Sequence, residues 1–442
     1  MAAIKKPKMT CLQLTMAVML NMLGSSIILM PTSLAEVGTI SLLAWGVTVT
    51  GAASLAYVFA KCGMLNRNSA GLGGYSEYAF GKPGSFLANY CYGISLVIAN
   101  LSIAVSIVGY LMVLFEVDLT PVEMGLASIG VLWVCSMFNV RGARFTGALA
   151  HYAAYGIIIP VLILTVAGWY WFSWDTYVAG WNPQNLSTFD GISAAITMTL
   201  WGFLGLETAC ANADAVEEPE KSVPKAMILA TLGAGIVYIL ANNISFGIVG
   251  VEPIANSTAP FGLVFATMFS PEIGKVVIAS MALACAGCLT SWQFTIAEVY
   301  RISAREGYFP SIFGKVTKLN VPLVGMCLIL LMQSAAAFLT MDPNLNEQFT
   351  ILKDLAVVTN LVPYLFALGA VNMMVHREAP DALYSKRMFW IAAFASLYSL
   401  YAIYACGESA LMWGSLTVYL GIFLYGSAAK KLATRPNLLV RD

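Results

Sequence analysis

Long runs of apolar residues separated by short polar stretches set the pattern of this sequence. The apolar runs fall at about residues 11–36, 40–60, 84–114, 122–139, 148–173, 190–212, 225–250, 274–303, 322–340, 348–374, 388–405 and 409–427. Each is close to the roughly 20 residues that a helix needs to cross a bilayer. No polar stretch is long enough for a second domain. The pattern therefore predicts a single all-α integral membrane domain over residues 1–442, with about twelve transmembrane helices.

Composition supports the same class of protein. Hydrophobic residues make up 59% of the chain and charged residues only 10%, whereas soluble domains have about 25% charged residues. The formal net charge is zero, which argues against a nucleic-acid-binding protein. Most cysteines lie in apolar runs, where we expect them to pack as small hydrophobic residues. Cys285 and Cys288 have the spacing of a zinc or redox pair, but no second pair and no nearby His accompany them. We expect no metal and no cofactor.

The distribution of positive charge predicts the orientation in the membrane. With the N-terminus inside, all of the 23 Lys and Arg residues except Lys275 and Lys353 fall on the inner side. Such an excess marks the cytoplasmic face, so both termini are expected in the cytoplasm. The basic start followed by an apolar run is typical of a signal peptide too, but it has no clear cleavage site, and we expect it to be retained as the first helix.

Two of the apolar runs are interrupted in the middle. The first contains Gly24-Ser25-Ser26-Ile27 followed by Pro31, and the sixth contains Trp201 to Glu207 with Gly202 and Gly205. Paired interruptions at matching positions of two halves indicate a transporter's substrate site. Five segments separate them, which predicts two inverted repeats at about 11–173 and 190–374, with extra helices at about 388–427. Close helix packing through small residues is the alternative interpretation.

Glu207 places a carboxylate at membrane depth. This is costly unless the group faces protein or water, so an intramembrane acid suggests a functional site. We expect it to pair with a substrate ammonium or to act as a protonation switch; the alternative is a neutral acid that packs between helices. The broken helices would add free N–H groups for a carboxylate and free C=O groups for an ammonium. Aromatic rings nearby can face a cation.

A glycine-rich stretch precedes the third span. Gly71 to Tyr78 lacks the Gly-Lys-Ser/Thr sequence of a phosphate-binding loop. We expect a turn at the inner membrane face that places Tyr75 and Glu77 beside the pathway, although Glu77 could also be a solvated loop acid.

Several motifs resemble those of one known family. They are Gly24-Ser25-Ser26-Ile27, Gly73-Gly74-Tyr75, Trp201 to Glu207, Glu218-Pro219 to Pro224, Glu306-Gly307-Tyr308-Phe309-Pro310 and Asn360-Leu361-Val362-Pro363-Tyr364. In this order they resemble the amino acid–polyamine–organocation transporters, and within them the basic amino acid/polyamine antiporters. The resemblance implies a LeuT-like fold with helices 1 and 6 broken. It also implies exchange of a cationic amino acid for its decarboxylated amine, ornithine for putrescine, with Trp201 as the outer gate and Trp292 and Tyr92 in the pocket.

The candidate residues form two sets. Expected substrate-binding residues are Asn21, Met22, Gly24, Ser25, Ser26, Ile27, Tyr92, Asn100, Trp201, Leu204, Glu207, Trp292 and Tyr364. Expected gating or pathway residues are Cys62, Tyr75, Glu77, Cys210, Cys285, Glu298, Lys353, Asp354 and Tyr425.

Some of these candidates have competing interpretations. Asn100 could instead bond another helix, and Cys62 could simply pack. Lys353 and Asp354 could form a surface pair at the outer start of helix ten, or point into the outer vestibule. Glu298 is expected to pair with Arg301 near the inner surface.

The expected partners are small cationic substrates and the lipid bilayer, and the sequence leaves a homodimer open. We expect a multi-pass protein of the bacterial inner membrane. The lysine–cadaverine, histidine–histamine and arginine–agmatine pairs remain alternatives to ornithine and putrescine. So does proton-coupled uptake with Glu207 or Glu298 carrying the proton.

Overall fold

The predicted membrane helices form in a computed structural model of the chain, which describes residues 10–65, 71–207, 217–342, 344–378 and 382–432. Within these ranges the regular secondary structure is entirely helical. Nine helices there are long and apolar enough to cross a membrane. The shorter apolar helices Cys11–Gly24 and Leu323–Leu339, together with α8 (Thr188–Trp201), occupy the remaining predicted spans. The all-helical membrane class is thereby confirmed, while the inverted repeats stay a prediction.

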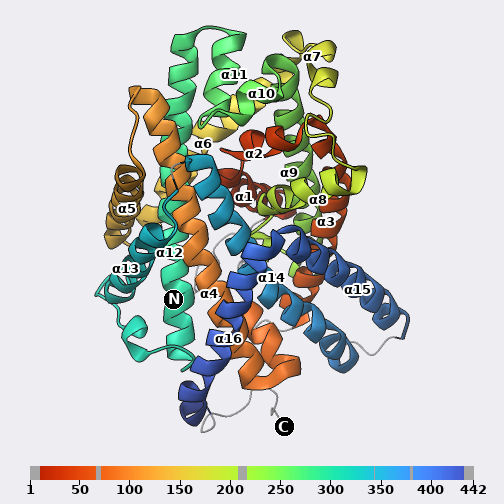
Figure 1. The fold of residues 1–442 in the computed structure, drawn as a ribbon. Coiled ribbons are helices and arrows are strands. Elements are labelled where there is room, and N and C mark those ends of the chain that lie inside the picture. Colours follow the sequence, from red (N-terminus) through yellow and green to blue (C-terminus); the bar gives the residue numbers. More distant parts are fainter. Residues whose placement is uncertain (1–9, 66–70, 208–216, 343, 379–381, 433–442) are drawn as a thin grey trace, which may run out of the picture.

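Most spans are single helices, and the first is divided into two (Figure 1). The first span consists of α1 (Cys11–Ser26) and α2 (Met30–Val37), and α8 forms the part of the sixth span before its break. The remaining spans are α3 (Leu42–Leu65), α4 (Leu72–Phe115), α5 (Pro121–Phe138), α6 (Ala143–Ala167), α9 (Pro219–Val249), α12 (Pro271–Arg305), α13 (Leu323–Leu339), α14 (Leu345–Glu378), α15 (Ala382–Ala405) and α16 (Gly407–Leu432). Short helices α7 (Trp174–Ala179), α10 (Val251–Ala255) and α11 (Pro260–Met268) gather at one end.

Local sequence explains where several helices begin. Thr10 and Gln13 form a capping box at the start of α1, and Thr120 and Glu123 form another at α5. In such a box each side chain binds a backbone N–H group that has no partner within the helix. Proline at the first turn of α5 lacks one of those N–H groups and already has a helical φ angle. These signals explain why the predicted boundaries of the spans are close to the observed ones.

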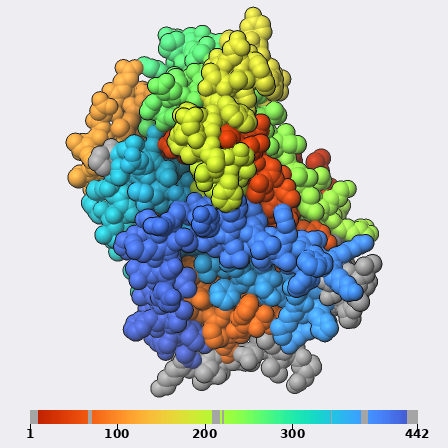
Figure 2. Space-filling model, turned by 45° about the vertical axis from the view of Figure 1, so that its right-hand side comes forward, coloured from red at the N-terminus to blue at the C-terminus, as the bar shows by residue number. Residues whose placement is uncertain are grey.

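Helices α4 and α14 form the centre of the molecule. They share the most extensive contact of any two helices and run side by side in Figure 1. In the most apolar window of α4, 78% of the residues are buried, whereas the corresponding value for α16 is 17%. The outer faces of α6 and α16 expose apolar side chains such as Val166 and Phe423, as lipid contact requires. Figure 2 shows the blue C-terminal helices covering the lower part of one face, next to red residues of the first spans.

The stretch between Gly71 and Tyr78, which we expected to form a turn, is helical instead. Gly71 (φ 63°) provides the turn, and α4 begins directly after it at Leu72. A second bend lies at Gly81 (φ 63°, ψ −163°), a backbone conformation that favours glycine. Pro83 follows two residues later and cannot donate a backbone hydrogen bond across the bend. The glycines therefore place a short helical piece at an angle before the long part of α4.

Candidate functional site

The first span breaks three residues later than we expected. α1 continues through Gly24 and Ser26, and the turn lies at residues 27–29, between α1 and α2. Pro31 explains the position, because proline has no N–H group for the carbonyl of Ile27 and its ring crowds that carbonyl. Gly24 instead allows close packing: a Cβ atom there would lie 2.6 Å from the sulfur of Cys288. The break itself is confirmed, and its assignment to Gly24–Ile27 was wrong.

The second break is where the sequence predicts it. α8 ends at Trp201, and residues 202–205 form a turn in which Gly205 has φ 96°. This left-handed conformation favours glycine. A Cβ atom on Gly205 would also lie 2.9 Å from the ring of Trp292. Glycine therefore provides both the bend and the close approach of the indole. Cys210, an expected pathway residue, lies outside the described residues.

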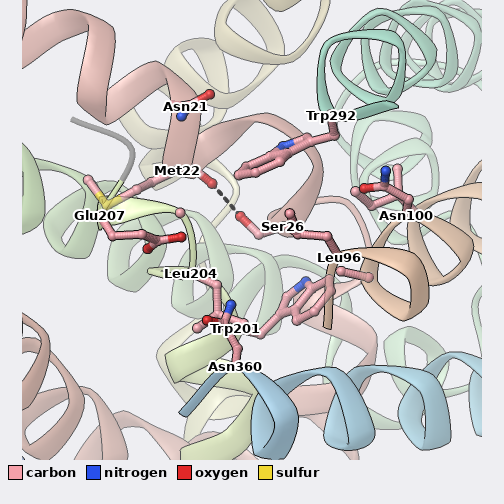
Figure 3. A pocket seen from close by; sticks show the side chains of 13 residues that line it. Asn21, Met22, Ser26, Leu96, Asn100, Trp201, Leu204, Glu207, Trp292 and Asn360 are labelled. Carbon is pink, nitrogen blue, oxygen red and sulfur yellow. Dashed lines mark hydrogen bonds between the residues drawn. The ribbon is translucent and has the colours of Figure 1, made fainter. Parts of the chain in front are cut away.

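A cavity lies between the two breaks (Figure 3). Of the expected binding residues, Asn21, Met22, Ser26, Asn100, Trp201, Leu204, Glu207 and Trp292 line it. In Figure 3, Glu207 and Asn100 stand on opposite sides, with the rings of Trp201 and Trp292 between them. Gly24, Ile27, Tyr92 and Tyr364 are not part of the lining, and the side chain of Ser25 is not described. Residues that we did not select but that line the cavity are Leu96, Ala99, Ile103, Gly205 and Asn360.

Two tyrosines hold the carboxylate of Glu207. The Tyr92 hydroxyl, from α4, donates to Oε1 at 2.8 Å, and the Tyr364 hydroxyl, from α14, donates to Oε2. Each carboxylate oxygen can accept more than one hydrogen bond, so both phenols and a substrate ammonium can share the group. Tyr92 and Tyr364 therefore act on the site through Glu207.

Two amide oxygens face the cavity without a hydrogen-bond partner among the described residues. They are Asn100 Oδ1 and Asn360 Oδ1. The amide nitrogen of Asn100 donates to Gln293 Oε1 at 3.3 Å, and the amide of Gln293 donates to Gln333 at 2.8 Å. Since the nitrogen of Asn100 is used, its oxygen is left to accept a bond from an ammonium. The bond from Asn100 to another helix is thus confirmed, while its contact with an amine stays a prediction. Nothing in the sequence indicated the supporting glutamines beyond their position in apolar helices.

Carbonyl groups that we expected to be free at the breaks are already bonded. The hydroxyl of Tyr238, on α9, lies 2.7 Å from the carbonyl oxygen of Met22 and 2.8 Å from that of Gly202. The Ser26 hydroxyl donates to the same Met22 carbonyl at 2.5 Å. The acceptors best placed for a cation are therefore the carboxylate and the two amides rather than these two carbonyls.

One aromatic contact and one charged contact join α8 to α14. Trp201 packs edge-on against Phe349, with ring centroids 6.3 Å apart. Lys353 Nζ lies 3.2 Å from Thr197 Oγ1 and 3.1 Å from Asp354 Oδ1. The side chains of Lys353 and Asp354 are only 4% and 18% exposed. The surface-pair interpretation was wrong, because α14 begins at Leu345 and Lys353 lies two turns inside it.

The remaining pathway candidates lie away from the cavity. Glu77 is buried and accepts a hydrogen bond from the Tyr308 hydroxyl at 2.7 Å, so it is not a solvated loop acid. Tyr425 packs on Phe86 beside Tyr308, with ring centroids 5.4 Å apart, and lines a separate apolar cavity. Expected candidates that are simply buried in the core are Cys62, Tyr75 and Cys285.

Glu298 forms the expected pair with Arg301, in which two guanidinium nitrogens contact the carboxylate. This pairing holds Glu298 on its own helix, outside the cavity lining. Metal chemistry has no support in the described residues, where no cluster of three or more His, Cys, Asp or Glu could hold an ion.

Comparison with known proteins supports a transport site. Residues 9–424 match the profile of a family described as amino acid permease. The chain is 50% identical over 426 residues to the putrescine transporter PotE of Escherichia coli (strain K12), which covers 96% of this chain and 97% of that protein. It is 49% identical over 427 residues to PotE of Haemophilus influenzae, with 97% and 98% covered. It is 32% identical over 355 residues to the cadaverine/lysine antiporter of Escherichia coli (strain K12), with 78% and 79% covered.

Proposed function

Since the chain belongs to the amino acid permease family and is a multi-pass membrane transporter rather than an enzyme, we propose that it exchanges ornithine for putrescine by alternating access. Two relatives with about half of their residues identical are named putrescine transporters. The location in the bacterial inner membrane is part of the proposal, and the cytoplasmic position of both termini is inferred from the placement of Lys and Arg.

The arrangement of acceptors in the cavity carries this proposal. Glu207 lies at one side, and the unpartnered oxygens of Asn100 and Asn360 lie elsewhere on the wall. A diamine has an ammonium group at each end and an apolar chain between them. Separated acceptors with indole rings between them match that distribution, and each ring can add about 0.5–2 kcal/mol of cation–π attraction.

The carboxylate of ornithine requires donors that putrescine does not use. The indole N–H of Trp201 is buried at the cavity and has no hydrogen-bond partner among the described residues. The backbone at the break of the first span supplies further N–H groups at the junction of two helices. We assign the carboxylate to this side of the cavity and the ammonium groups to Glu207 and the amides.

Closures on both sides of the cavity fit an alternating mechanism. Trp201 and Thr197 bind α8 to α14 through Phe349 and Lys353. On another side, Glu207 joins the break of the sixth span to α4 and α14 through its two tyrosines. Opening one set of contacts at a time would expose the cavity to one side of the membrane.

Counterflow in proteoliposomes tests the exchange. Uptake of labelled putrescine should depend on ornithine inside, and Glu207→Gln should abolish it. Glu252→Gln, which changes an exposed acid of α10, should leave it intact. Equal uptake into empty vesicles would contradict obligate exchange.

The response to membrane potential provides a second test of the exchange. Ornithine carries one net positive charge and putrescine two, so exchange exports one charge per cycle. A potential negative inside opposes that step by about 2.3 kcal/mol per 100 mV. The potential should therefore slow the entry of ornithine against putrescine.

The relation to the cadaverine/lysine antiporter supports lysine and cadaverine as the second candidate pair. A competition panel of basic amino acids and their amines would separate the two. Uptake driven by an imposed pH gradient, without internal substrate, would instead select a proton-coupled permease.

A further inference from the structure

Tyr238 on α9 contacts the last turn of α1, just before the first break, and the break of the sixth span, although no sequence motif drew attention to it. Its hydroxyl lies within hydrogen-bond distance of Met22 O (2.7 Å) and Ser26 Oγ (2.7 Å) in the first span, and of Gly202 O (2.8 Å) in the sixth. The side chain is completely buried. One phenol therefore joins α9 to the last turn of α1 and to the break that follows α8.

The two hydroxyl groups of Tyr238 and Ser26 have one proton each, and two carbonyl oxygens are available to accept them. Ser26 Oγ donates to Met22 O at 2.5 Å, which leaves the proton of Tyr238 for Gly202 O. The pair of hydroxyls thus bonds one backbone carbonyl in the last turn of α1 and one in the break of the sixth span. A buried carbonyl left without such a partner costs about 1–3 kcal/mol. Loss of the Tyr238 hydroxyl would remove this bond from the Gly202 carbonyl, whereas Met22 O would keep the bond from Ser26 Oγ.

Packing fixes the position of the Tyr238 ring. It stacks on Trp45, with centroids 5.6 Å apart and planes at 21°, and meets Phe203 edge-on at 5.7 Å. A Cβ atom on Gly202 would lie 2.9 Å from the same ring. Because three sides of the ring are occupied, the hydroxyl cannot follow a moving backbone, and the backbone of the breaks has to conform to it.

We propose that Tyr238 is the positioning residue that holds the break of the first span in the geometry that accepts a substrate carboxylate. This rests on the proposed function, in which that carboxylate binds at the first break. The last turn of α1, from Met22 to Ser26, leads directly into the break, and Tyr238 and Ser26 tie this turn to Gly202.

The residues proposed to bind the ammonium groups are held in place by contacts that do not involve Tyr238. Glu207 is fixed by Tyr92 and Tyr364, and Asn100 by Gln293. None of these bonds involves Tyr238. Loss of the Tyr238 hydroxyl therefore weakens binding of the amino acid more than binding of the diamine, which has no carboxylate.

Kinetics of reconstituted full-length protein test this assignment. Tyr238→Phe removes only the hydroxyl. We expect KM for ornithine to rise roughly 3- to 10-fold, which is the range for one net hydrogen bond. KM for putrescine should change by less than about 2-fold, because putrescine has no carboxylate that depends on this geometry. Ser26→Ala, which removes the other hydroxyl, should shift the ratio of the two KM values in the same direction.

The matched control is Tyr177→Phe. The Tyr177 hydroxyl donates to Asn243 Oδ1 at 2.7 Å, so the variant loses a bond of similar length to the same helix α9, away from both breaks. Its ratio of KM values should equal that of the wild type. If Tyr238→Phe fails to fold, as judged by size-exclusion chromatography, Ser26→Ala decides the question.

Equal changes in KM for both substrates would overturn the assignment, because a purely structural role predicts no selectivity. If the wild-type protein does not exchange ornithine for putrescine, the proposed function fails instead. The same ratio is then measured for whichever amino acid and amine the wild type carries, so that the role of Tyr238 is judged separately.

Discussion

Lys353 and Thr197 join two helices through a buried charge: the ammonium of Lys353, on α14, lies 3.2 Å from the hydroxyl of Thr197, on α8. A charged side chain inside a membrane protein is costly unless it is paired. Here Asp354 supplies the opposite charge at 3.1 Å. The contact also lies one helical turn from Trp201 and one from Phe349, the aromatic pair at the same seam.

Lys353→Met should destabilise the protein by about 3–5 kcal/mol, because it leaves the carboxylate of Asp354 buried without its partner. The double variant Lys353→Met/Asp354→Asn removes both charges and should recover most of that loss. Thermal unfolding in detergent measures both effects. If the double variant were less stable than the single one, the pair would not be the reason for the loss.

Tyr364→Phe should lower kcat/KM for putrescine roughly 10- to 100-fold, since a hydrogen bond to a charged group is worth about 1.5–3 kcal/mol. Tyr92→Phe should have an effect of the same order, because its hydroxyl serves the other oxygen of Glu207. In a Glu207→Gln background, both substitutions should have much smaller effects on substrate binding. Undiminished effects in that background would show that the tyrosines act independently of the acid.

Gly205→Ala should abolish transport, because an alanine at φ 96° is strained and its Cβ would lie 2.9 Å from Trp292. Gly147→Ala in α6 is the matched control. No atom lies within 4 Å of the Cβ position there, and alanine favours a helix by up to about 1 kcal/mol over glycine. Uptake of labelled putrescine by both variants checks the prediction. An active Gly205→Ala protein would mean that the bend is not required.

Asn360→Leu should raise KM for putrescine by roughly 3- to 10-fold, because leucine is similar in size to asparagine but has no oxygen to accept a hydrogen bond at the cavity wall. Gln333→Met should have a smaller effect in the same direction, since it loosens Gln293, which holds the amide of Asn100. Competition between putrescine and a labelled substrate measures both. An unchanged KM for Asn360→Leu would place the second ammonium elsewhere.

An exposed ion pair joins the C-terminal end of α4 to the beginning of α12, and its effect should depend on pH. Lys275 Nζ lies 2.5 Å from Glu116 Oε1, and this contact lowers the pKa of the Glu116 carboxyl. A lowered pKa in the folded state means that the stabilisation is present at neutral pH and is lost as the pH falls through that pKa. The difference in Tm between wild type and Glu116→Gln should therefore be small at pH 7 and vanish once the pH falls below the lowered pKa of Glu116. A difference that grew in acid would contradict this.

The class of fold could be predicted from the sequence because bilayer thickness restricts both composition and segment length. The break at Gly202–Gly205 was also predictable, since glycine marks a backbone that other residues cannot adopt easily. The break of the first span was predicted three residues too early, because Gly24 suggested flexibility there. Pro31 instead decides where the helical hydrogen bonding stops. The proline rule alone would have pointed to Ile27.

Contacts between segments far apart in the chain could not be predicted from the sequence. Tyr238 lies in an ordinary apolar run, and nothing near it indicates that its hydroxyl meets two carbonyls from other spans. The same holds for Gln293 and Gln333, whose pairing depends on how three helices pack. For Lys353 the sequence left a surface pair and a vestibule position open, because hydropathy does not show which neighbouring helix covers a side chain.

The two phenols that bind Glu207 belong to α4 and α14, the pair of helices with the largest shared interface. Their hydroxyl groups are therefore held by one closely packed pair of helices. Glu207, by contrast, lies beyond the turn at residues 202–205, after α8 has ended at Trp201. We expect opening of the carrier to move Glu207 relative to the two tyrosines, because the acid lies beyond the break of the sixth span and the tyrosines belong to two closely packed helices.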